Sequence, residues 1–268
     1  MGITNWNTEL LPYEQAVDEI VLKLKSVRRD FLRRQLHSPI EQVEGRVKSI
    51  ASIIAKANDR NIPIDKALDV LEDIAGIRII CRFVEDIEKV VNMIRSRNDY
   101  DMKILQEEDY VTNTKKSGYR SYHITIEYKI MYENEVMPLK CEIQIRTLAM
   151  NFWATIEHSL RYKYDGHLPE HLKERLHNCA EAAFKLDNEM TTIRGELLQA
   201  QKTKQTQDFL VNEIVKNIHN LYAFGKVEHM NDFNKEFMEI FRDGNVNELS
   251  EFNHKLETMA EIYNVRYV

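Results

Sequence analysis

The sequence is poor in the residues that break or cross-link a chain. Its 268 residues include only five prolines, eight glycines and three cysteines. So few helix breakers favour a helix-rich protein. The cysteines are odd in number and lie in apolar runs, which indicates buried free thiols in a reducing compartment and not a disulfide framework. They are Cys81, Cys141 and Cys179.

The sequence also lacks long apolar runs and an evident targeting segment. No stretch approaches the length of a membrane span. Residues 1–9 have neither the basic region nor the apolar core of a signal peptide, so we expect a cytoplasmic protein without a membrane partner. A formal charge of −6 argues against a protein that coats nucleic acid. With 43% hydrophobic and 30% charged residues, the composition is that of a globular protein.

Several nucleotide and metal motifs are absent. No glycines have the Gly-x-Gly-x-x-Gly spacing, and Gly225-Lys226 is followed by Val227, so the sequence has no P-loop. None of the nine histidines precedes an aspartate, which excludes a His-Asp metal phosphohydrolase signature. Cys-x-x-Cys and His-Glu-x-x-His are missing as well, so a zinc site is not expected.

What the sequence does contain is a predicted β-hairpin between Lys115 and Arg146. Polar and apolar residues alternate with the period of a strand on both sides of a loop at Met131–Pro138. Pairing of the two strands gives an apolar face and a polar face, the latter carrying His123, Thr125, Glu127, Glu142, Gln144 and Arg146. The polar face is either solvated surface or a ligand site. The approach Lys-Lys-Ser-Gly-Tyr-Arg favours a site, because it brings backbone, cations and an aromatic ring together.

Two cationic helices are predicted before this hairpin. The first, Tyr13–Leu36, is rich in lysine and arginine, and either is simply solvated or holds an anion or a partner. The second, Val47–Asp59, follows a break at Pro39 and carries Lys48, Ser52 and Lys56 at four-residue intervals along one edge. Two ammonium groups with a hydroxyl between them suit a polyphosphate, although an exposed lysine-rich face has the same pattern.

A buried strand is predicted at Ile77–Phe83, with Arg78 and Arg82 on one face. Arginines in an apolar strand need an anion or a carboxylate nearby. Asp73, at the strand entrance, either answers that need structurally or holds a metal together with Glu142. These are the two carboxylates best placed to meet over one sheet.

The remaining segments are predicted to be mostly helical. We expect a short helix at Asp65–Glu72, a helix at Asp86–Arg97, an edge strand at Asp101–Glu107, and a polar loop at Glu108–Thr114. Helices follow at Leu148–Tyr164, with an apolar stripe of Phe152, Ile156 and Leu160, and at Glu170–Lys202. A polar joint at Lys202–Asp208 then precedes helices at Phe209–Phe224, Met230–Phe241 and Val246–Tyr263. The fold class is therefore α+β, a mixed β-sheet flanked by helices (residues 1–202) with an all-helical C-terminal extension (residues 203–268).

Four ordered motifs carry a family resemblance. They are Gly45-Arg-Val-Lys-Ser-Ile-Ala-Ser, Asp73-Ile-Ala-Gly-Ile-Arg, Lys115-Lys-Ser-Gly-Tyr-Arg-Ser-Tyr-His, and Glu142-Ile-Gln-Ile-Arg-Thr with the following Ala149-Met-Asn-Phe-Trp-Ala-Thr-Ile-Glu-His. Together they resemble the nucleotidyltransferase-like synthetase domain of the RelA/SpoT family, in particular its small alarmone synthetases of the RelQ type. The resemblance spans about Trp6 to Lys202. It implies transfer of the β,γ-pyrophosphate of ATP to the 3′-OH of GDP or GTP, giving ppGpp or pppGpp and AMP.

The resemblance also implies residue roles. Arg46 and Arg78 would sandwich adenine, and Lys48, Ser52 and Lys56 would hold the ATP phosphates. Asp73 and Glu142 would be the catalytic pair and bind Mg²⁺, with Glu142 also accepting the proton of the 3′-OH. Tyr119 would stack on guanine. The other guanine-nucleotide contacts would be Lys115, His123, Gln144 and Asn151.

The sequence departs from the family pattern in three places. The hydrolase half is absent, so we expect synthesis without degradation. Glu108 stands where RelQ-type members carry an arginine. Relatives activated by pppGpp form a homotetramer with a central cleft; Lys25 and Arg28 suit that cleft, but Gln42 and Glu44 replace its phenylalanine and threonine. We therefore expect a homotetramer with weak or no activation. A non-catalytic guanine-nucleotide sensor and an RNA-binding regulator that uses the first helix are the alternatives.

Overall fold

The computed structural model describes residues 6–163, 168–224 and 230–262. The chain divides into two compact units, residues 1–191 and residues 192–268. Each unit is built around its own apolar core.

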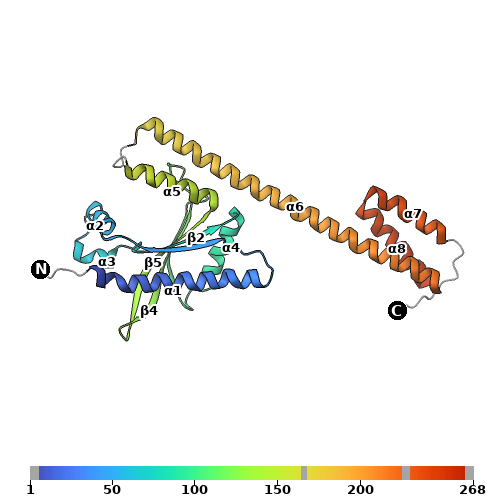
Figure 1. Ribbon diagram of the computed structural model, residues 1–268, viewed down its shortest axis with the longest axis horizontal. Helices are drawn as coiled ribbons and strands as arrows, with labels where there is room; N and C mark the ends of the chain where they lie inside the picture. Colours follow the sequence, from blue (N-terminus) through green and yellow to red (C-terminus); the bar gives the residue numbers. More distant parts are fainter. Residues whose placement is uncertain (1–5, 164–167, 225–229, 263–268) are drawn as a thin grey trace. The chain divides into compact units, whose positions relative to one another are not determined.

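Unit 1 contains a five-stranded mixed sheet with strand order β1-β2-β5-β4-β3. Figure 1 labels its strands β2, β4 and β5. Strands β2 and β5 pair in parallel, and all other neighbours are antiparallel. The mixed sheet expected from the sequence is therefore confirmed, and the predicted hairpin is its longest element. The strand bounds are β1 Gln42–Val47, β2 Ala75–Cys81, β3 Lys103–Asp109, β4 Tyr122–Tyr132 and β5 Glu135–Thr147.

Helices cover the apolar face of this sheet. Isoleucines of β2, β4 and β5 form one buried cluster with apolar side chains of α1 and α4. Burial of this apolar area is the main favourable term in folding of the unit. The opposite, polar face is thereby left to carry the site. The helices of unit 1 outside α6 are α1 Trp6–Arg33, α2 Ile50–Asp59, η1 Ile64–Lys66, α3 Ala67–Val70, α4 Val84–Arg95 and α5 Leu148–Lys163.

Gly45 explains how closely α1 approaches β1. A Cβ at this position would lie 2.4 Å from Cγ1 of Val17 and 2.7 Å from Cγ2 of Val21. No real side chain is accommodated at such distances, so only glycine lets helix α1 rest directly on the strand. The close contact also sets the position of the next residue, Arg46, on the opposite face of the sheet.

The second predicted helix begins later than expected, because a strand precedes it. Residues 42–47 form β1, and α2 starts at Ile50 with Ser49 as its N-cap. Lys48 therefore lies ahead of the helix and not on its edge. Ile53 and Ala57 are its buried residues, whereas Ile54 is 37% exposed. The helix predicted at Asp65–Glu72 is two short pieces, η1 and α3.

The other strand and loop predictions differ in extent. The buried strand begins two residues earlier than predicted and ends at Cys81, so Arg82 lies beyond it. The edge strand is confirmed, but it continues through Glu108 to Asp109, which shortens the predicted polar loop. In the hairpin only Glu133 and Asn134 separate the strands, both with positive φ.

The apolar stripe predicted for α5 is on the wrong face. Met150, Trp153 and Ala154 are buried, whereas Phe152 is 70% exposed and Ile156 46% exposed. The long helix also differs: α6 runs from Glu170 to Phe224 without a break, so the polar joint at Lys202–Asp208 is helical. Polarity alone does not interrupt a helix when no proline or glycine is present to break its hydrogen bonds.

Unit 2 comprises the second part of α6 together with α7 (Met230–Asp243) and α8 (Val246–Ile262). Its buried side chains include Ile214 and Leu221 of α6 and Leu249 and Phe252 of α8. A buried amide pair crosses this core, since Asn217 Nδ2 donates to Asn253 Oδ1 at 3.0 Å. Such a pair ties α6 and α8 to one register, because a shift would leave both amides unsatisfied.

Two expectations from composition have mixed outcomes. Cys81 and Cys141 are buried free thiols as predicted, but Cys179 is exposed on α6, so the prediction is wrong there. In the described ranges, no helix is both long and apolar enough to cross a membrane.

Candidate functional site

The register of the strands brings the predicted polar residues onto one face of the sheet. Arg46 of β1 lies opposite Gly76 of β2. Arg78 of β2 lies opposite Gln144 of β5, which in turn lies opposite His123 of β4. Because side chains alternate between faces, these positions and Glu142, two residues before Gln144, point to the same side. Residues far apart in the sequence thus line one surface.

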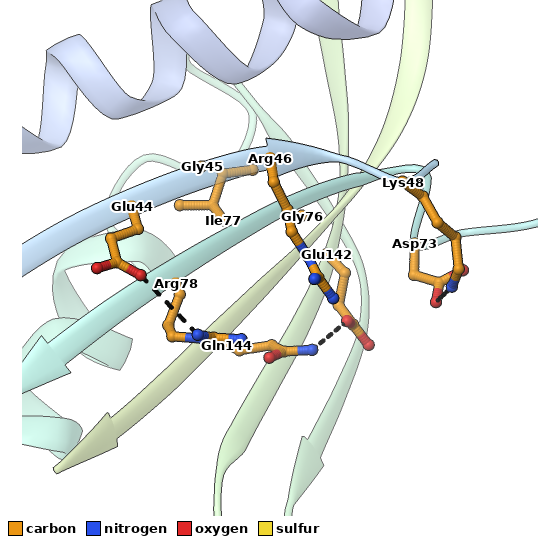
Figure 2. Close-up of a pocket in the computed structure, with 10 residues that line it drawn as sticks. All are labelled: Glu44, Gly45, Arg46, Lys48, Asp73, Gly76, Ile77, Arg78, Glu142 and Gln144. Atoms are coloured by element: carbon orange, nitrogen blue, oxygen red, sulfur yellow. Dashed lines mark hydrogen bonds and ion pairs between the residues drawn. The ribbon is translucent and has the colours of Figure 1, made fainter. Parts of the chain in front are cut away.

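A cavity of about 130 Å³ opens on this face. Figure 2 shows side chains from β1, β2 and β5 projecting to the same side of the sheet, with Asp73 and Lys48 at one end. Gly76 leaves the middle of the cavity without a side chain. The lining residues are Glu44, Gly45, Arg46, Lys48, Asp73, Gly76, Ile77, Arg78, Glu142 and Gln144.

Asp73 is held between two ammonium groups. Its Oδ2 accepts from Lys48 Nζ at 2.5 Å and from Lys56 Nζ at 2.6 Å. Burial raises the pKa of Asp73, but these two hydrogen bonds outweigh burial and leave the pKa below its ordinary value. Its other oxygen, Oδ1, is buried without a hydrogen-bond partner. Asp73 therefore pairs with the lysines and not with Arg78, and it keeps one free oxygen for a further ligand.

Glu142 is tied to its neighbours through both oxygens. His123 Nδ1 lies 3.1 Å from Oε1, and Gln144 Nε2 donates to Oε2 at 2.6 Å. Burial raises the pKa of Glu142, but the contacts with His123 and Gln144 outweigh it and the net pKa is lowered. Because the negative charge of Asp73 also acts on its pKa, the two carboxylates interact electrostatically. Both are ionised at neutral pH.

The cationic end of the cavity is crowded with guanidinium groups. Burial first, then the charges of Arg146 and Arg46, lower the pKa of Arg78. Glu44 compensates only in part, with its Oε2 3.9 Å from Arg78 Nη1. The Nε of Arg78 is buried and has no partner. A cluster of like charges with an unsatisfied donor is suited to an anionic ligand with a flat ring system.

A second group of side chains adjoins Glu142. The Tyr119 hydroxyl lies 2.8 Å from His123 Nε2 and accepts from Arg146 Nη2 at 2.6 Å. The Lys115 ammonium lies 5.3 Å from the centroid of the Tyr119 ring. Gly118, at φ +86°, makes the turn before Tyr119, and a Cβ there would lie 2.6 Å from Cβ of Ala180. The polar hairpin face is therefore organised around a partly exposed tyrosine, not an idle solvated surface.

Some predicted residues stand apart from this group. Ser52 contacts Ser49, its Oγ lying 2.8 Å from Ser49 Oγ in the first turn of α2. Asn151 lies in the first turn of α5, and its buried Oδ1 has no hydrogen-bond partner. Lys25 and Arg28 line a separate concavity between α1 and β1. That concavity shares Glu44 and Gly45 with the cavity on the sheet, so β1 separates the two.

Three residues of the site were not predicted as functional residues. Arg146 is 5% exposed, yet no carboxylate lies within ion-pair distance of it in the described ranges. The sequence places Arg146 on the polar face of the hairpin, because the alternation of Glu142 and Gln144 continues to it. Gly76 and Tyr110 gave no such signal, since nothing in the sequence shows that one lines the cavity and the other packs on His123.

Asp73 and Glu142 fit a divalent cation of the magnesium type. Magnesium prefers carboxylate oxygens and is commonly held by one or two carboxylates plus substrate phosphates. The unpartnered Oδ1 of Asp73 is such a donor. No group of three or more His, Cys, Asp or Glu residues suited to a metal occurs in the part of the chain that the structure describes. The donor set therefore suits a cation that also takes ligands from a substrate.

Two interacting carboxylates line a cationic cavity, and one of them also contacts a tyrosine-centred group; this arrangement is suited to nucleotide-dependent phosphoryl transfer. Residues 45–167 match the family model described as a region found in RelA / SpoT proteins. The chain is 49% identical over 201 residues to GTP pyrophosphokinase YjbM of Bacillus subtilis (strain 168), covering 75% of this chain and 94% of that protein. The chain belongs to the RelA/SpoT family.

Solved structures of small alarmone synthetase 1 from Bacillus subtilis are similar to this chain. The complex with its product pppGpp superposes with a TM-score of 0.68 at 49% identity, covering 71% of this chain and 97% of that one. The complex with AMPCPP gives a TM-score of 0.64 at 45% identity, covering 72% and 98%. The family and the fold expected from the four motifs are thus confirmed.

Proposed function

We propose that this protein transfers the β,γ-pyrophosphate of ATP to the 3′-OH of GDP or GTP, making ppGpp or pppGpp and AMP. The relative with 49% identity is a GTP pyrophosphokinase, and a solved neighbour binds pppGpp as its product. The observation that carries the proposal is that Asp73 and Glu142 line one cavity, and that Glu142 also contacts His123 of the group around Tyr119. In-line transfer needs a donor and an acceptor aligned across such a pair.

The donor half is supported by the cations around Asp73. Without nucleotide, Lys48 and Lys56 both rest on Asp73 Oδ2. ATP phosphates offer these ammonium groups a stronger partner, because several negative oxygens replace one. Binding of ATP would therefore move the lysines to phosphate and release Asp73. Arg46 and Arg78, on the floor of the cavity, are suited to the adenine ring.

The acceptor half is supported by the group around Tyr119. Stacking of guanine on this ring would place the 3′-OH toward Glu142. The 3′-oxygen then bonds to the β-phosphorus, the bond from that phosphorus to the bridging oxygen of the α-phosphate breaks, and AMP leaves with the bridging oxygen. Glu142, ionised and held by His123 and Gln144, accepts the hydroxyl proton. Lys115, Gln144 and Asn151 contact the guanine nucleotide.

Mg²⁺ is the proposed cofactor, with Asp73 and Glu142 as its protein ligands. When bound, such an ion neutralises the charge that develops on the transferred phosphates. The proposal also places the protein in the cytoplasm, where ATP and GTP are available.

Product analysis with labelled ATP tests the function. Incubation with Mg²⁺ and GDP should move a γ-phosphate label into ppGpp, while an α-phosphate label should appear in AMP. Formation of ADP would mean transfer of a single phosphate and would contradict the proposal. Binding of guanine nucleotide without formation of AMP would support the alternative of a non-catalytic sensor.

RNA binding through α1 has less support. Two of its cations and the following Arg34 already face carboxylates: Lys23 faces Asp101 at 3.0 Å, Arg28 faces Glu41 at 3.9 Å, and Arg34 faces Asp30 at 3.1 Å. Contacts with phosphate would have to replace these pairs. A mobility shift that weakens steeply with salt would favour RNA binding; its absence would remove this alternative.

We further propose a homotetramer that pppGpp activates weakly or not at all. Exposed apolar side chains on α5, including Leu148 at 51% and Phe152 at 70%, support self-association. In the concavity with Lys25 and Arg28, Glu41 already approaches Arg28 and lies 2.6 Å from Arg82 Nε, so carboxylates oppose a further anion. Light scattering should give a tetramer mass. A marked rise in initial rate on adding pppGpp would refute the weak activation.

A further inference from the structure

Tyr110 occupies a fixed position beside the acceptor half of the site. It follows the last residue of β3, and its backbone N–H donates to the carbonyl of Ser121 at 3.0 Å. The turn after it is held by Asp109, whose Oδ1 accepts from the N–H groups of Val111 and Thr112 at 2.9 Å each. The interaction of its hydroxyl with Glu108, together with burial, raises the pKa of Tyr110 to about 12. The backbone at Tyr110 and in the turn after it is therefore held in place.

The ring of Tyr110 contacts three residues of the acceptor half. It meets the His123 ring edge-to-face, with centroids 5.3 Å apart and planes at 89°, and the Tyr119 ring at 6.2 Å and 65°. The ammonium of Lys115 lies 3.9 Å from its centroid, closer than to Tyr119. These distances are in the range where aromatic pairs and cation–π contacts are favourable. One ring thus holds a cation and two aromatic neighbours.

The contact with Tyr110 leaves the Lys115 ammonium able to bind an anion. In the described ranges no carboxylate lies within ion-pair distance of its ammonium, so the Tyr110 ring is its partner. A ring attracts a cation more weakly than a phosphate does, because it carries a quadrupole and not a net charge. Lys115 is therefore kept beside the site and is easily transferred to an incoming phosphate. A salt bridge would hold it more firmly and oppose that transfer.

Tyr110 also packs against the imidazole of His123, which contacts the Glu142 carboxylate. The imidazole joins the Tyr119 hydroxyl, at 2.8 Å, to the Glu142 carboxylate, at 3.1 Å. Both bonds depend on the ring plane of His123, and the perpendicular ring of Tyr110 packs against that plane. Rotation of the imidazole would break the edge-to-face contact and one of the two bonds. Tyr110 thus limits the orientations of the imidazole.

We infer that Tyr110 is a positioning residue for the guanine nucleotide: its ring presets Lys115 and His123 for the acceptor. The inference rests on the proposed function and adds to it a residue that touches neither the reacting atoms nor the ATP cavity. The inference distinguishes the two substrates, because the site residues that the Tyr110 ring contacts (Lys115, Tyr119 and His123) all belong to the acceptor half. Loss of the ring should weaken binding of the guanine nucleotide and leave binding of ATP unaffected.

Calorimetric titration of the full chain with GDP and, separately, ATP in the presence of Mg²⁺ tests this. Tyr110→Leu should raise the Kd for GDP about tenfold, in line with the loss of one cation–π and two aromatic contacts. The Kd for ATP should stay within about twofold. Tyr110→Phe keeps the ring and should resemble the unmodified chain. Tyr100→Leu removes a tyrosine that is 86% exposed and is the matched control. Where Tyr110→Leu lowers the melting midpoint, Tyr110→Met, which fills the volume better, carries the same expectation.

A double variant separates positioning from a structural role. If the ring acts through Lys115, Tyr110→Leu should add little to the loss of GDP affinity that Lys115→Met causes, since the contact between the two residues is already gone. Unchanged GDP binding in Tyr110→Leu, or equal weakening of GDP and ATP, would overturn the inference while alarmone synthesis by the unmodified chain leaves the function standing. An unmodified chain that binds neither nucleotide would overturn both.

Discussion

Different neighbours lower the pKa of Asp73 and the pKa of Glu142. Asp73 is held ionised by two ammonium groups, whereas Glu142 depends on His123 and Gln144. Their functions under the proposed reaction differ accordingly. The lysines on Asp73 can move to phosphate, but the partners of Glu142 lie on neighbouring positions of the sheet and hold its oxygens in place.

Replacing either carboxylate by its amide should abolish synthesis without unfolding the chain. Asp73→Asn and Glu142→Gln keep the shape but remove the charge, so the rate should fall by at least about a hundredfold. Initial rates of AMP release measure the effect, and circular dichroism checks the fold. Glu135→Gln, an exposed carboxylate at the far end of β5, is the control. Full activity in both amide variants would contradict the assignment.

Asp187 predicts a pH dependence of stability in unit 1. It is 5% exposed, its Oδ2 accepts from Thr147 Oγ1 at 2.6 Å, and burial raises its pKa to about 6. The unfolded chain loses this proton near pH 4 and the folded chain near pH 6. Stability therefore declines as pH rises from 4 to 6 and stays lower above it, by about 1 kcal/mol after allowance for solvent screening.

Asp187→Asn should remove that loss, because an amide does not ionise. The melting midpoint of the variant should exceed that of the unmodified chain by about 2–4 °C at pH 7.5 and match it near pH 4. Thermal melts across this range provide the measurement, with the exposed Asp65→Asn as control. A midpoint difference that is the same at every pH would refute the titration of Asp187.

Among the elements, β1 and β2 decide whether the cavity exists. Gly45 faces α1 and lets the helix rest on β1, while Gly76 faces the cavity and leaves its floor open. Two glycines on opposite faces of neighbouring strands thus have different roles, one in packing and the other in binding. A Cβ at Gly76 would meet only the carbonyl oxygen of Arg46, at 3.7 Å, so the strand itself tolerates a side chain there.

Gly76→Val should therefore keep the fold and obstruct the nucleotide. Valine favours a strand, but overfilling a packed site costs about 1–3 kcal/mol, so the KM for ATP should rise about tenfold or more. Gly76→Ala should have a smaller effect. Gly195→Val places the same side chain where nothing lies within 4 Å and serves as the control. An unchanged KM for ATP in Gly76→Val would show that adenine does not use this cavity.

For the whole molecule, the predicted catalytic and nucleotide-binding residues all lie in residues 46–151, within unit 1. Unit 2 has its own apolar core and its own buried amide pair. The relative with 49% identity matches only 201 residues of this chain, so about a quarter of it has no counterpart there. Synthesis should therefore not need unit 2.

A chain ending at residue 202 should make alarmone at a rate within about threefold of the full chain, because separate cores fold and act independently. Initial rates at matched concentration and a light-scattering mass for each chain provide the comparison. A truncated chain that is folded but inactive would show that unit 2 takes part in synthesis, and a changed mass would assign it to assembly.

The sequence by itself determined the family, the mixed sheet and the identity of the charged residues in the site. Motif order and period-two alternation can be recognised in the sequence without a structure, because they are properties of the local chain. It placed His123, Glu142 and Gln144 on one face correctly for that reason. It misplaced the start of α2. It also misplaced the buried face of α5, since burial depends on which neighbours a helix meets.

Only the tertiary structure decided which partners those residues have. Lys48 and Lys56 converge on Asp73 from 25 and 17 positions away in sequence, and Tyr110 packs on His123 through the pairing of β3 with β4. Such contacts come from strand register and helix packing, which bring together segments with no local pattern in common. The residue types therefore determine which chemistry the site can perform, whereas the fold determines its geometry.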